Sequence, residues 1–315
     1  GASNPLMDMI KGWMDSDKIG KVAKVQIWTN RPVWPQGGAF PKPDPSNKPS
    51  DMEWDLWLGP APEIPFTPNL HPFNWRGWWA FGTGSLGDMA CHIMDPVFRC
   101  LPILYPSDVE CSVASIWKGM WDDTANTDSC PPSTIIHLTY PRTDGKKGDI
   151  KVSWYDGGLL QQRPDELLPE EAFGNWDGGV LFIGTKGKLL ADCYGAKPRL
   201  LPTKLMKDVK MPKQTIQRVP EGHYLQWVNA CIAGYGNGKT SSPFEFAGPF
   251  TESILIGNLA IRSWMMKNPN LTGLNDKYLG RKKLLWDAKN MQITNFDPAN
   301  QFVKRQYREG WKLEL

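Results

Sequence analysis

Residues 180–191 read VLFIGTKGKLLA, two apolar runs on either side of a Gly-Thr-Lys-Gly turn. Short apolar runs that are separated by a glycine-containing turn are typical of a β-hairpin. The two strands of a hairpin run antiparallel, because a short turn reverses the chain. This stretch therefore predicts an antiparallel sheet as the framework of the fold.

Further strand and helix patterns surround this hairpin. Strand-like runs cover residues 21–30, 109–117, 134–140 and 150–155, and helical spacing covers residues 4–19, 85–101, 223–233 and 249–266. The strands outnumber the helices and do not alternate strictly with them. This order predicts an α+β fold, with a largely antiparallel sheet covered by helices on one face.

The chain shows no internal repeat and no domain break, so residues 1–315 are taken as one large domain. Residues 31–72 hold eleven of the 28 prolines and three tryptophans, which predicts a long irregular excursion that packs over the body. Residues 284–315 carry aromatic side chains in an otherwise polar tail, which predicts a docked C-terminal arm.

Composition limits the class of protein. The hydrophobic share of 41% supports a real core. The 36 basic and 33 acidic residues leave a net charge of +3, too balanced for a nucleic-acid partner. No apolar run reaches the roughly 18 residues of a membrane helix. The six cysteines show no regular spacing, so free, mostly buried thiols are expected, with no metal site.

Tryptophan is the unusual component, with 16 residues in the chain. Its large ring fills cores, and its flat face also suits a sugar ring. Seven of the 16 lie between Trp28 and Trp79, so both uses remain open.

Two stretches imitate phosphate-binding loops. Residues 82–87 match G-x-G-x-x-G, but a dinucleotide fold needs a buried parallel strand directly before the loop, and none is expected there. Residues 238–240 read Gly-Lys-Thr, but they follow a predicted helix, and Ala233 occupies the place of the first glycine of a P-loop. Both stretches are therefore rejected as nucleotide sites.

Residues 82–95, GTGSLGDMACHIMD, carry the best candidate for chemistry. Asp88 and His92 are four residues apart, so on a helix they lie one turn apart on the same face. A carboxylate there can orient or charge-couple an imidazole, and the pair could move a proton to and from an alcohol. The alternative is an exposed Asp/His pair without catalytic function.

Weaker candidates lie near this pair or at strand and helix ends. Each has a structural alternative, such as an aromatic core or a capped turn. An arginine within an aromatic run needs a partner, which makes Arg76 the strongest of them. The candidate substrate-binding residues are Trp75, Arg76, Trp78, Tyr155 and His223, while Asp156 could equally cap a turn, and His71 and His137 are taken as structural.

Several separate motifs resemble one family. Residues 82–95, together with WDLWLGPAP at 54–62 and HPFNWRGWW at 71–79, resemble the Gfo/Idh/MocA family of NAD(P)-dependent oxidoreductases. KVSWYDGG at 151–158 and TNFDPANQF at 294–302 support the same resemblance. The likeness runs from about Asn4 to Trp311.

This resemblance implies a two-domain enzyme. Members join a Rossmann domain, which has a glycine loop and a catalytic lysine, to a C-terminal α/β domain with an open, mainly antiparallel sheet. The present chain resembles the second domain and lacks an initiator Met. We therefore expect residues 1–315 to be the C-terminal substrate-binding and oligomerisation domain of a longer enzyme. The chain alone is expected to bind no NAD or NADP and to be inactive.

The resemblance also assigns roles. It places the acid/base at His92 and an orienting or hydroxyl-binding carboxylate at Asp88, while hydride passes to or from nicotinamide. The expected ligand is a sugar-like small molecule, and self-association is expected through the uncovered face of the sheet. One departure is Ala90-Cys91, where many members have glycine before the histidine. The compartment, cytoplasmic or periplasmic, is not decided.

Three functions remain open at this stage. The chain could be the substrate domain of a sugar or polyol dehydrogenase. It could also belong to a glycosidase that uses NAD for transient oxidation and elimination. The third possibility is a carbohydrate-binding or scaffold module without catalysis.

Overall fold

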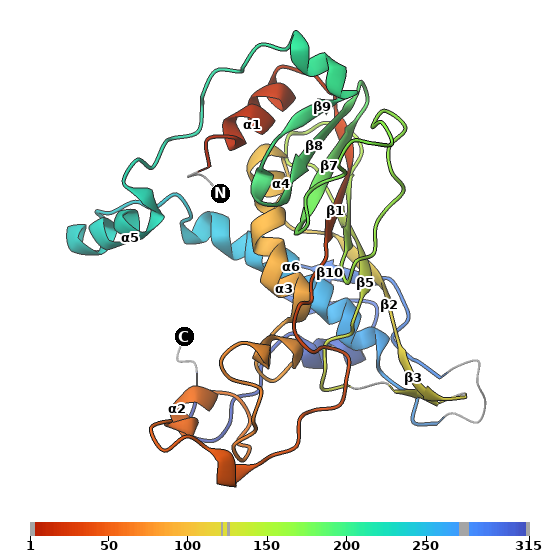
Figure 1. Ribbon diagram of the computed structural model, residues 1–315, viewed down its shortest axis with the longest axis vertical. Helices are drawn as coiled ribbons and strands as arrows, with labels where there is room; N and C mark the ends of the chain where they lie inside the picture. The colour runs from red at the N-terminus through yellow and green to blue at the C-terminus, as the bar shows by residue number, and fades with distance from the viewer. Residues whose placement is uncertain (1–3, 121, 125–126, 271–276, 313–315) are drawn as a thin grey trace.

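The computed structural model describes residues 4–120, 122–124, 127–270 and 277–312, and a nine-stranded sheet organises them (Figure 1). Its neighbours run antiparallel except β1 and β6, which are parallel. The strand order is β11 (Gln292–Ile293), β10 (Leu284–Asp287), β2 (Asp108–Val113), β5 (Thr134–Tyr140), β6 (Ile150–Tyr155), β1 (Val22–Thr29), β7 (Gly178–Gly184), β8 (Lys188–Asp192) and β9 (Arg199–Leu201).

The hairpin predicted at residues 180–191 is formed by β7 and β8. The Gly184 N–H donates to the Gly187 carbonyl at 2.9 Å and closes the turn. A separate two-stranded sheet pairs β3 (Ile116–Gly119) with β4 (Asp122–Thr124), so the run expected over 109–117 is divided between two sheets. The α+β class and the mainly antiparallel sheet are confirmed.

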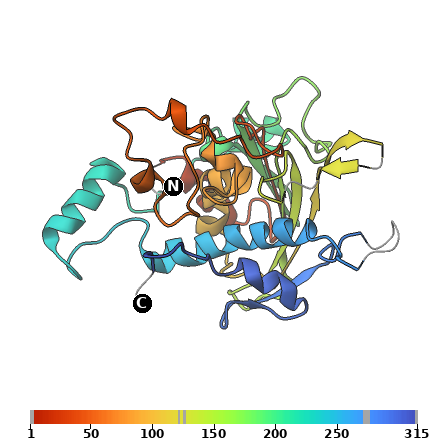
Figure 2. The same ribbon diagram turned by 90° about the horizontal axis from the view of Figure 1, so that it is seen from below.

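Helices cover one face of the sheet (Figures 1 and 2). They are α1 (Met7–Asp15), α3 (Gly84–Ile93), α4 (Asp95–Cys100) and the long α6 (Phe244–Trp264), while α2 (Trp54–Leu58) and α5 (Gly222–Ala233) lie outside this layer. The helix expected over 85–101 is broken into α3 and α4, because Pro96 in the first turn of α4 cannot continue the hydrogen bonding of a helix.

The core lies between this helical layer and the sheet. Leu86 and Ile93 of α3 are buried against the same cluster as Ile136 of β5 and Trp154 of β6. Burial of each such side chain contributes roughly 1.5–3 kcal/mol relative to its exposure to water. The apolar stripe that the sequence predicted along residues 86–101 therefore faces the sheet and fixes the position of α3.

The proline-rich excursion at residues 31–72 contains little regular structure, as expected. It forms a small apolar core of its own around Trp54, Phe66 and Leu70, which Trp78 joins from outside the excursion. In Figure 1 this lobe lies below α6, beside the body and not spread over it.

The C-terminal arm docks on three parts of the molecule. β10 pairs with β2, and the 3-10 turn η5 (Asp297–Phe302) packs on α6. Arg308 then donates from Nη1 to the Asp55 carboxylate at 2.6 Å and from Nε to the Gly59 carbonyl at 2.7 Å. The arm thus joins the sheet to the excursion.

The second face of the sheet, which was expected to be uncovered, is covered in part. Residues 157–177 cover its apolar part, where Trp28 of β1 packs with Leu167 and Phe173. Over β5 and β6 the same face presents exposed polar side chains such as His137 and Lys151. Self-association through the uncovered part of this face therefore stays a prediction.

Residues 4–120, 122–124, 127–270 and 277–312 lack two kinds of feature. Within them no helix is long and apolar enough to cross a membrane. The same residues contain no group of three or more His, Cys, Asp or Glu side chains that could hold a metal ion. All six cysteines are free thiols, with Cys91 and Cys231 exposed.

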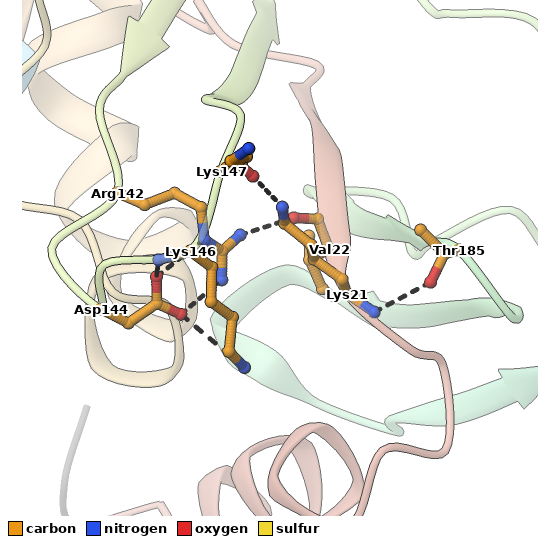
Figure 3. A network of polar contacts seen from close by, with 7 residues as sticks. All are labelled: Lys21, Val22, Arg142, Asp144, Lys146, Lys147 and Thr185. Carbon is orange, nitrogen blue, oxygen red and sulfur yellow. Dashed lines mark hydrogen bonds and ion pairs between the residues drawn. The ribbon is translucent and has the colours of Figure 1, made fainter.

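Two aspartates, Asp144 and Asp156, accept hydrogen bonds at the two ends of β6. Asp144 accepts both prongs of the Arg142 guanidinium at 2.9 and 2.8 Å, while Arg142 also donates to the Val22 carbonyl and Lys21 donates to the Lys147 carbonyl (Figure 3). At the opposite end of β6, Asp156 is buried and accepts from the Thr134 backbone and hydroxyl.

These two carboxylates respond to pH in opposite ways. Burial raises the pKa of Asp156 to about 7, although hydrogen bonds from Trp154 and Thr134 lower it. The hydrogen bond from Arg142 holds the pKa of Asp144 below its ordinary value. Because a raised folded-state pKa favours the protonated form, the Asp156 contribution to stability is complete below about pH 4 and is lost as pH rises through about 7.

We expect Asp156→Asn to weaken this pH dependence. The free energy of unfolding of the unchanged protein should fall between about pH 4 and 7 relative to the variant, which stays neutral throughout. Urea unfolding at a series of pH values measures the slope. Asp144→Asn is the matched control, because the titration of Asp144 lies at more acidic pH and leaves the slope in this window unchanged. Parallel stability curves for Asp156→Asn and the unchanged protein would contradict the assignment.

A second expectation concerns the contact of α6 with α3. A Cβ placed on Gly257 would lie 2.5 Å from Leu86 Cδ2 and 3.4 Å from Ile136 Cδ1. Gly257→Val should therefore lower the free energy of unfolding by about 1–3 kcal/mol, the usual cost of overpacking. Gly248→Ala is the control on the same helix, since a Cβ there meets nothing within 4 Å. Equal effects of the two substitutions in urea unfolding would show that the contact does not limit packing.

Candidate functional site

Asp88 and His92 both lie on α3, as the sequence predicted. The apolar residues of α3 face the sheet, so the two polar side chains are directed away from the core, where Asp88 is half-buried and His92 exposed. The helix is short, and its burial against α6 and the sheet fixes where this polar face lies. The two residues are therefore presented on a rigid element at the surface.

Asp88 pairs with a guanidinium rather than with the imidazole. Arg76 Nε donates to Asp88 Oδ1 at 2.9 Å, and the two side chains are only 24% and 27% exposed. The same guanidinium donates from Nη1 to the Phe73 carbonyl at 3.0 Å. Arg76 was expected to need a partner, and that partner is Asp88. The contact by which Asp88 was expected to orient His92 is replaced by an electrostatic interaction between the Asp88 charge and the His92 ring.

Aromatic rings enclose Arg76. Its guanidinium carbon lies 4.4 Å from the centre of the Phe73 ring, 4.6 Å from Trp75 and 5.9 Å from Trp34. A cation over aromatic faces is attracted by the ring quadrupole. Arg76 is therefore held both by its ion pair and by rings, and it fixes the Asp88 carboxylate next to His92.

His92 is bordered by Tyr194, with their ring centres 5.1 Å apart in an edge-to-face arrangement. Tyr194 lies in the 3-10 turn η3 (Cys193–Gly195), directly after β8, with a positive φ of 63°. Partial burial lowers the pKa of His92, and the charge of Asp88 opposes this shift while that of Arg31 supports it. A lowered pKa means that His92 is neutral at neutral pH and can accept a proton.

A second ion pair lies at the ends of β1 and β7. Arg31, two residues after β1, donates from Nη1 to Asp177 Oδ1 at 2.9 Å, and the guanidinium carbon lies 5.2 Å from the centre of the Trp176 ring. Burial raises the pKa of Tyr194, the charge of Asp177 adds to this shift and that of Arg31 opposes it. We call Arg31, Arg76, Asp88, His92, Asp177 and Tyr194 the polar rim.

Four of the seven predicted site residues come together here: Trp75, Arg76, Asp88 and His92. The other three do not. Trp78 is 4% exposed in the core of the excursion lobe, which leaves no ring face for a ligand. Tyr155 packs with the Trp28 cluster, on the face of the sheet away from α3. His223 lies on α5, which stands apart from α3 in Figures 1 and 2.

Sequence reasoning missed Arg31, Asp177 and Tyr194. Arg31 follows the strand predicted over 21–30, and site residues often lie just after a strand, so this signal was available. Asp177 and Tyr194 gave no comparable signal, because they are far from α3 in the sequence. Only the sheet order, which places β7 and β8 beside β1, brings them together.

The glycine-rich loop at residues 82–87 does not fit a dinucleotide. α3 follows the 3-10 turn η2 (Asn74–Gly77) and a short turn instead of a strand. A Cβ on Gly82 would lie 2.6 Å from the Arg76 carbonyl oxygen, and one on Gly87 would overlap Thr83 Oγ1. These glycines are required by local packing, so the loop gives no reason to place a nucleotide on it.

Comparison with known proteins gave a match to one family model. The model describes the C-terminal alpha/beta domain of an oxidoreductase family, and it matches residues 12–121. That range includes β1, the excursion, α3 and α4, and with them Arg31, Arg76, Asp88 and His92. No curated protein matches the chain.

Several solved structures are similar to the chain at low identity. An oxidoreductase from Thermotoga maritima is 10% identical with a TM-score of 0.42, and the match covers 83% of this chain and 58% of the other. The WlbA dehydrogenase from Bordetella pertussis, in complex with NADH and UDP-GlcNAcA, is 14% identical with a TM-score of 0.40, covering 82% and 59%. A levoglucosan dehydrogenase in complex with NADH and levoglucosan is 12% identical with a TM-score of 0.33, covering 83% and 54%.

The chain thus spans less than two thirds of the length of these structures, and at such identities and TM-scores the likeness carries no argument about its activity. The family match is independent of them and covers the residues that form most of the polar rim. Residues 12–121 thus match the model of the C-terminal α/β domain of the Gfo/Idh/MocA oxidoreductase family, in agreement with the resemblance seen in the sequence.

Proposed function

We propose that this chain is the substrate-binding domain of an NAD(P)-dependent oxidoreductase that acts on a sugar or a related polyol. The observation that carries the proposal is the exposed imidazole of His92 one helical turn from Asp88, which is held in an ion pair with Arg76. This arrangement lies within the residues that match an oxidoreductase domain. A bound nicotinamide would supply the hydride acceptor or donor, while this chain supplies position and proton transfer.

In the oxidation direction His92 acts as the general base. Its neutral imidazole accepts the hydroxyl proton of the substrate while the C–H bond of the same carbon is broken and its hydride leaves. Asp88 stabilises the imidazolium that forms, because its negative charge favours the protonated ring. In the reduction direction the imidazolium returns the proton to the new alkoxide, so each proton is accounted for.

Arg76 positions the carboxylate and does not move a proton. Because its Nε is bonded to Asp88 and its Nη1 to the Phe73 carbonyl, the guanidinium holds Asp88 in one place through the cycle. The aromatic rings around it offer flat surfaces for the apolar face of a sugar.

The cofactor would be held by a segment outside this chain's described residues. The glycine loop at 82–87 is packed for local reasons, and no other stretch carries a dinucleotide signature. The gene region upstream of the codon for residue 1 tests this point. A continuous reading frame that encodes a Rossmann glycine loop and a Lys-Pro lysine supports the proposal, and a stop codon immediately upstream contradicts it.

We expect the encoded longer protein to reduce NAD or NADP when it is incubated with the right sugar from a panel. Absorbance of the reduced nicotinamide measures the reaction, and release of nitrophenol from aryl glycosides is followed in the same samples. Cofactor reduction without glycoside cleavage supports the dehydrogenase. Cleavage that requires NAD without its net reduction would replace the dehydrogenase with the oxidative glycosidase, and inactivity on the whole panel would leave a binding module.

His92→Ala in that longer protein should lower kcat at least about 100-fold, the usual contribution of a general base. Its Kd for the cofactor should stay within about twofold of the unchanged protein. In the unchanged enzyme the oxidation rate should fall as pH drops below the His92 pKa, which lies below its ordinary value of 6.5, because the imidazolium cannot accept a proton.

His137→Ala is the control, because this histidine lies on the other face of the sheet and binds Ser153 Oγ at 2.8 Å. It should leave kcat and the pH profile unchanged. If His92→Ala keeps near-normal turnover, or keeps the acidic limb of the pH profile, the base is another residue.

A further inference from the structure

Trp176 lies at the tip of a tight turn that connects residues 157–175 to β7. Asn175 and Gly178 exchange backbone hydrogen bonds at 3.1 Å, which leaves Trp176 and Asp177 as the two central residues. The Asn175 side chain accepts from the Asp177 and Gly178 N–H groups, also at 3.1 Å. The turn is therefore fixed by its own hydrogen bonds.

The turn is also tied to the end of β1. Thr29 Oγ1 donates to the Asp177 carbonyl at 2.8 Å, and Asp177 holds Arg31 in the ion pair of the polar rim. The Arg31 guanidinium then lies over one face of the Trp176 ring. These contacts set the position of a ring that would otherwise move freely at a loop tip.

Despite this support, the Trp176 side chain is 72% exposed. A large apolar ring held rigidly in water loses the benefit of burial, and nothing in the core depends on it. An ordered, exposed aromatic ring beside hydrogen-bonding groups is a surface that suits a ligand with one apolar face and polar edges. A pyranose ring has this character, because its C–H groups form one face and its hydroxyls the edge.

The charges around Trp176 favour one class of sugar ligand over others. Arg31 is paired with Asp177 and Arg76 with Asp88, both at 2.9 Å, so these two cations are already neutralised. A carboxylate or phosphate on the ligand would have to displace one of these partners. An uncharged sugar requires no such exchange, and it can accept and donate hydrogen bonds at the rim.

We propose that Trp176, backed by Arg31 and Asp177, is a stacking platform for the pyranose ring of an uncharged sugar or glycoside. The platform adjoins the polar rim, because Arg31 and Asp177 are part of both. The charge of Arg31 also acts on the His92 ring. The inference rests on the proposed function in taking this ligand as the substrate. It adds the substrate class, a neutral sugar in preference to a sugar acid or nucleotide sugar.

Side-chain NMR of the 315-residue chain tests the platform without any cofactor. Tryptophan indole N–H signals are recorded with ¹⁵N-labelled tryptophan, and the signal lost in Trp176→Phe identifies Trp176. Methyl β-D-glucopyranoside and the methyl glycoside of D-glucuronic acid are the two probes. We expect the Trp176 signal to shift with the neutral glycoside and the uronate to bind at least about fivefold more weakly.

Three variants sharpen the test. Trp176→Ala, followed by isothermal titration calorimetry, should weaken binding of the neutral glycoside at least tenfold, whereas Trp176→Phe should keep it within about threefold. Trp227→Ala is the matched control, since this side chain on α5 is 64% exposed and lies away from the rim. Asp177→Asn should raise the affinity for the uronate, because it releases the Arg31 cation.

The proposal is overturned if the Trp176 signal does not move with the neutral glycoside. Equal loss of binding in Trp176→Ala and Trp227→Ala would also overturn it, as would uronate binding as tight as that of the neutral glycoside. These outcomes are independent of hydride transfer. Loss of turnover in His92→Ala with an unmoved Trp176 signal would leave the oxidoreductase in place and remove only the platform.

Discussion

The packing of α3 between α6 and the sheet is the contact on which the rest of the molecule depends. Leu86 reaches Gly257 on α6, where even one added carbon has little room, and the same side chain joins the core with Ile136 of β5. Because interiors are close-packed, this contact fixes the rotation of α3 about its own axis. That rotation decides where Asp88 and His92 emerge.

Around α3 the charged side chains form ion pairs that leave the His92 imidazole able to accept a proton. Asp88 is held by Arg76, and Asp177 by Arg31, so the rim combines two ion pairs with a neutral imidazole. Burial lowers the pKa of His92, while the charge of Asp88 limits that shift. The same pairing lowers the attraction of the rim for charged ligands, which links the proposed proton transfer to the proposed preference for neutral sugars.

Tryptophan, the unusual component of the sequence, is divided between two uses. Trp154 and Trp78 are buried and fill the main core and the excursion lobe. Trp75 borders Arg76, and Trp176 stands exposed at a fixed turn. Composition could not separate these uses, since a ring that packs and a ring that binds have the same chemistry, and only the neighbours that the fold supplies distinguish them.

By itself the sequence determined the main strands and helices and identified Asp88 and His92 as a pair. The hairpin at 180–191, the strands and the helical spacing of Asp88 and His92 follow from local patterns, because neighbouring residues fix backbone geometry. Tertiary structure alone decided which residues share the rim. Sheet order joins Arg31 to Asp177, and core packing removes Trp78 and Tyr155 from the site. Such contacts depend on how distant strands pair, and a local pattern carries no record of that pairing.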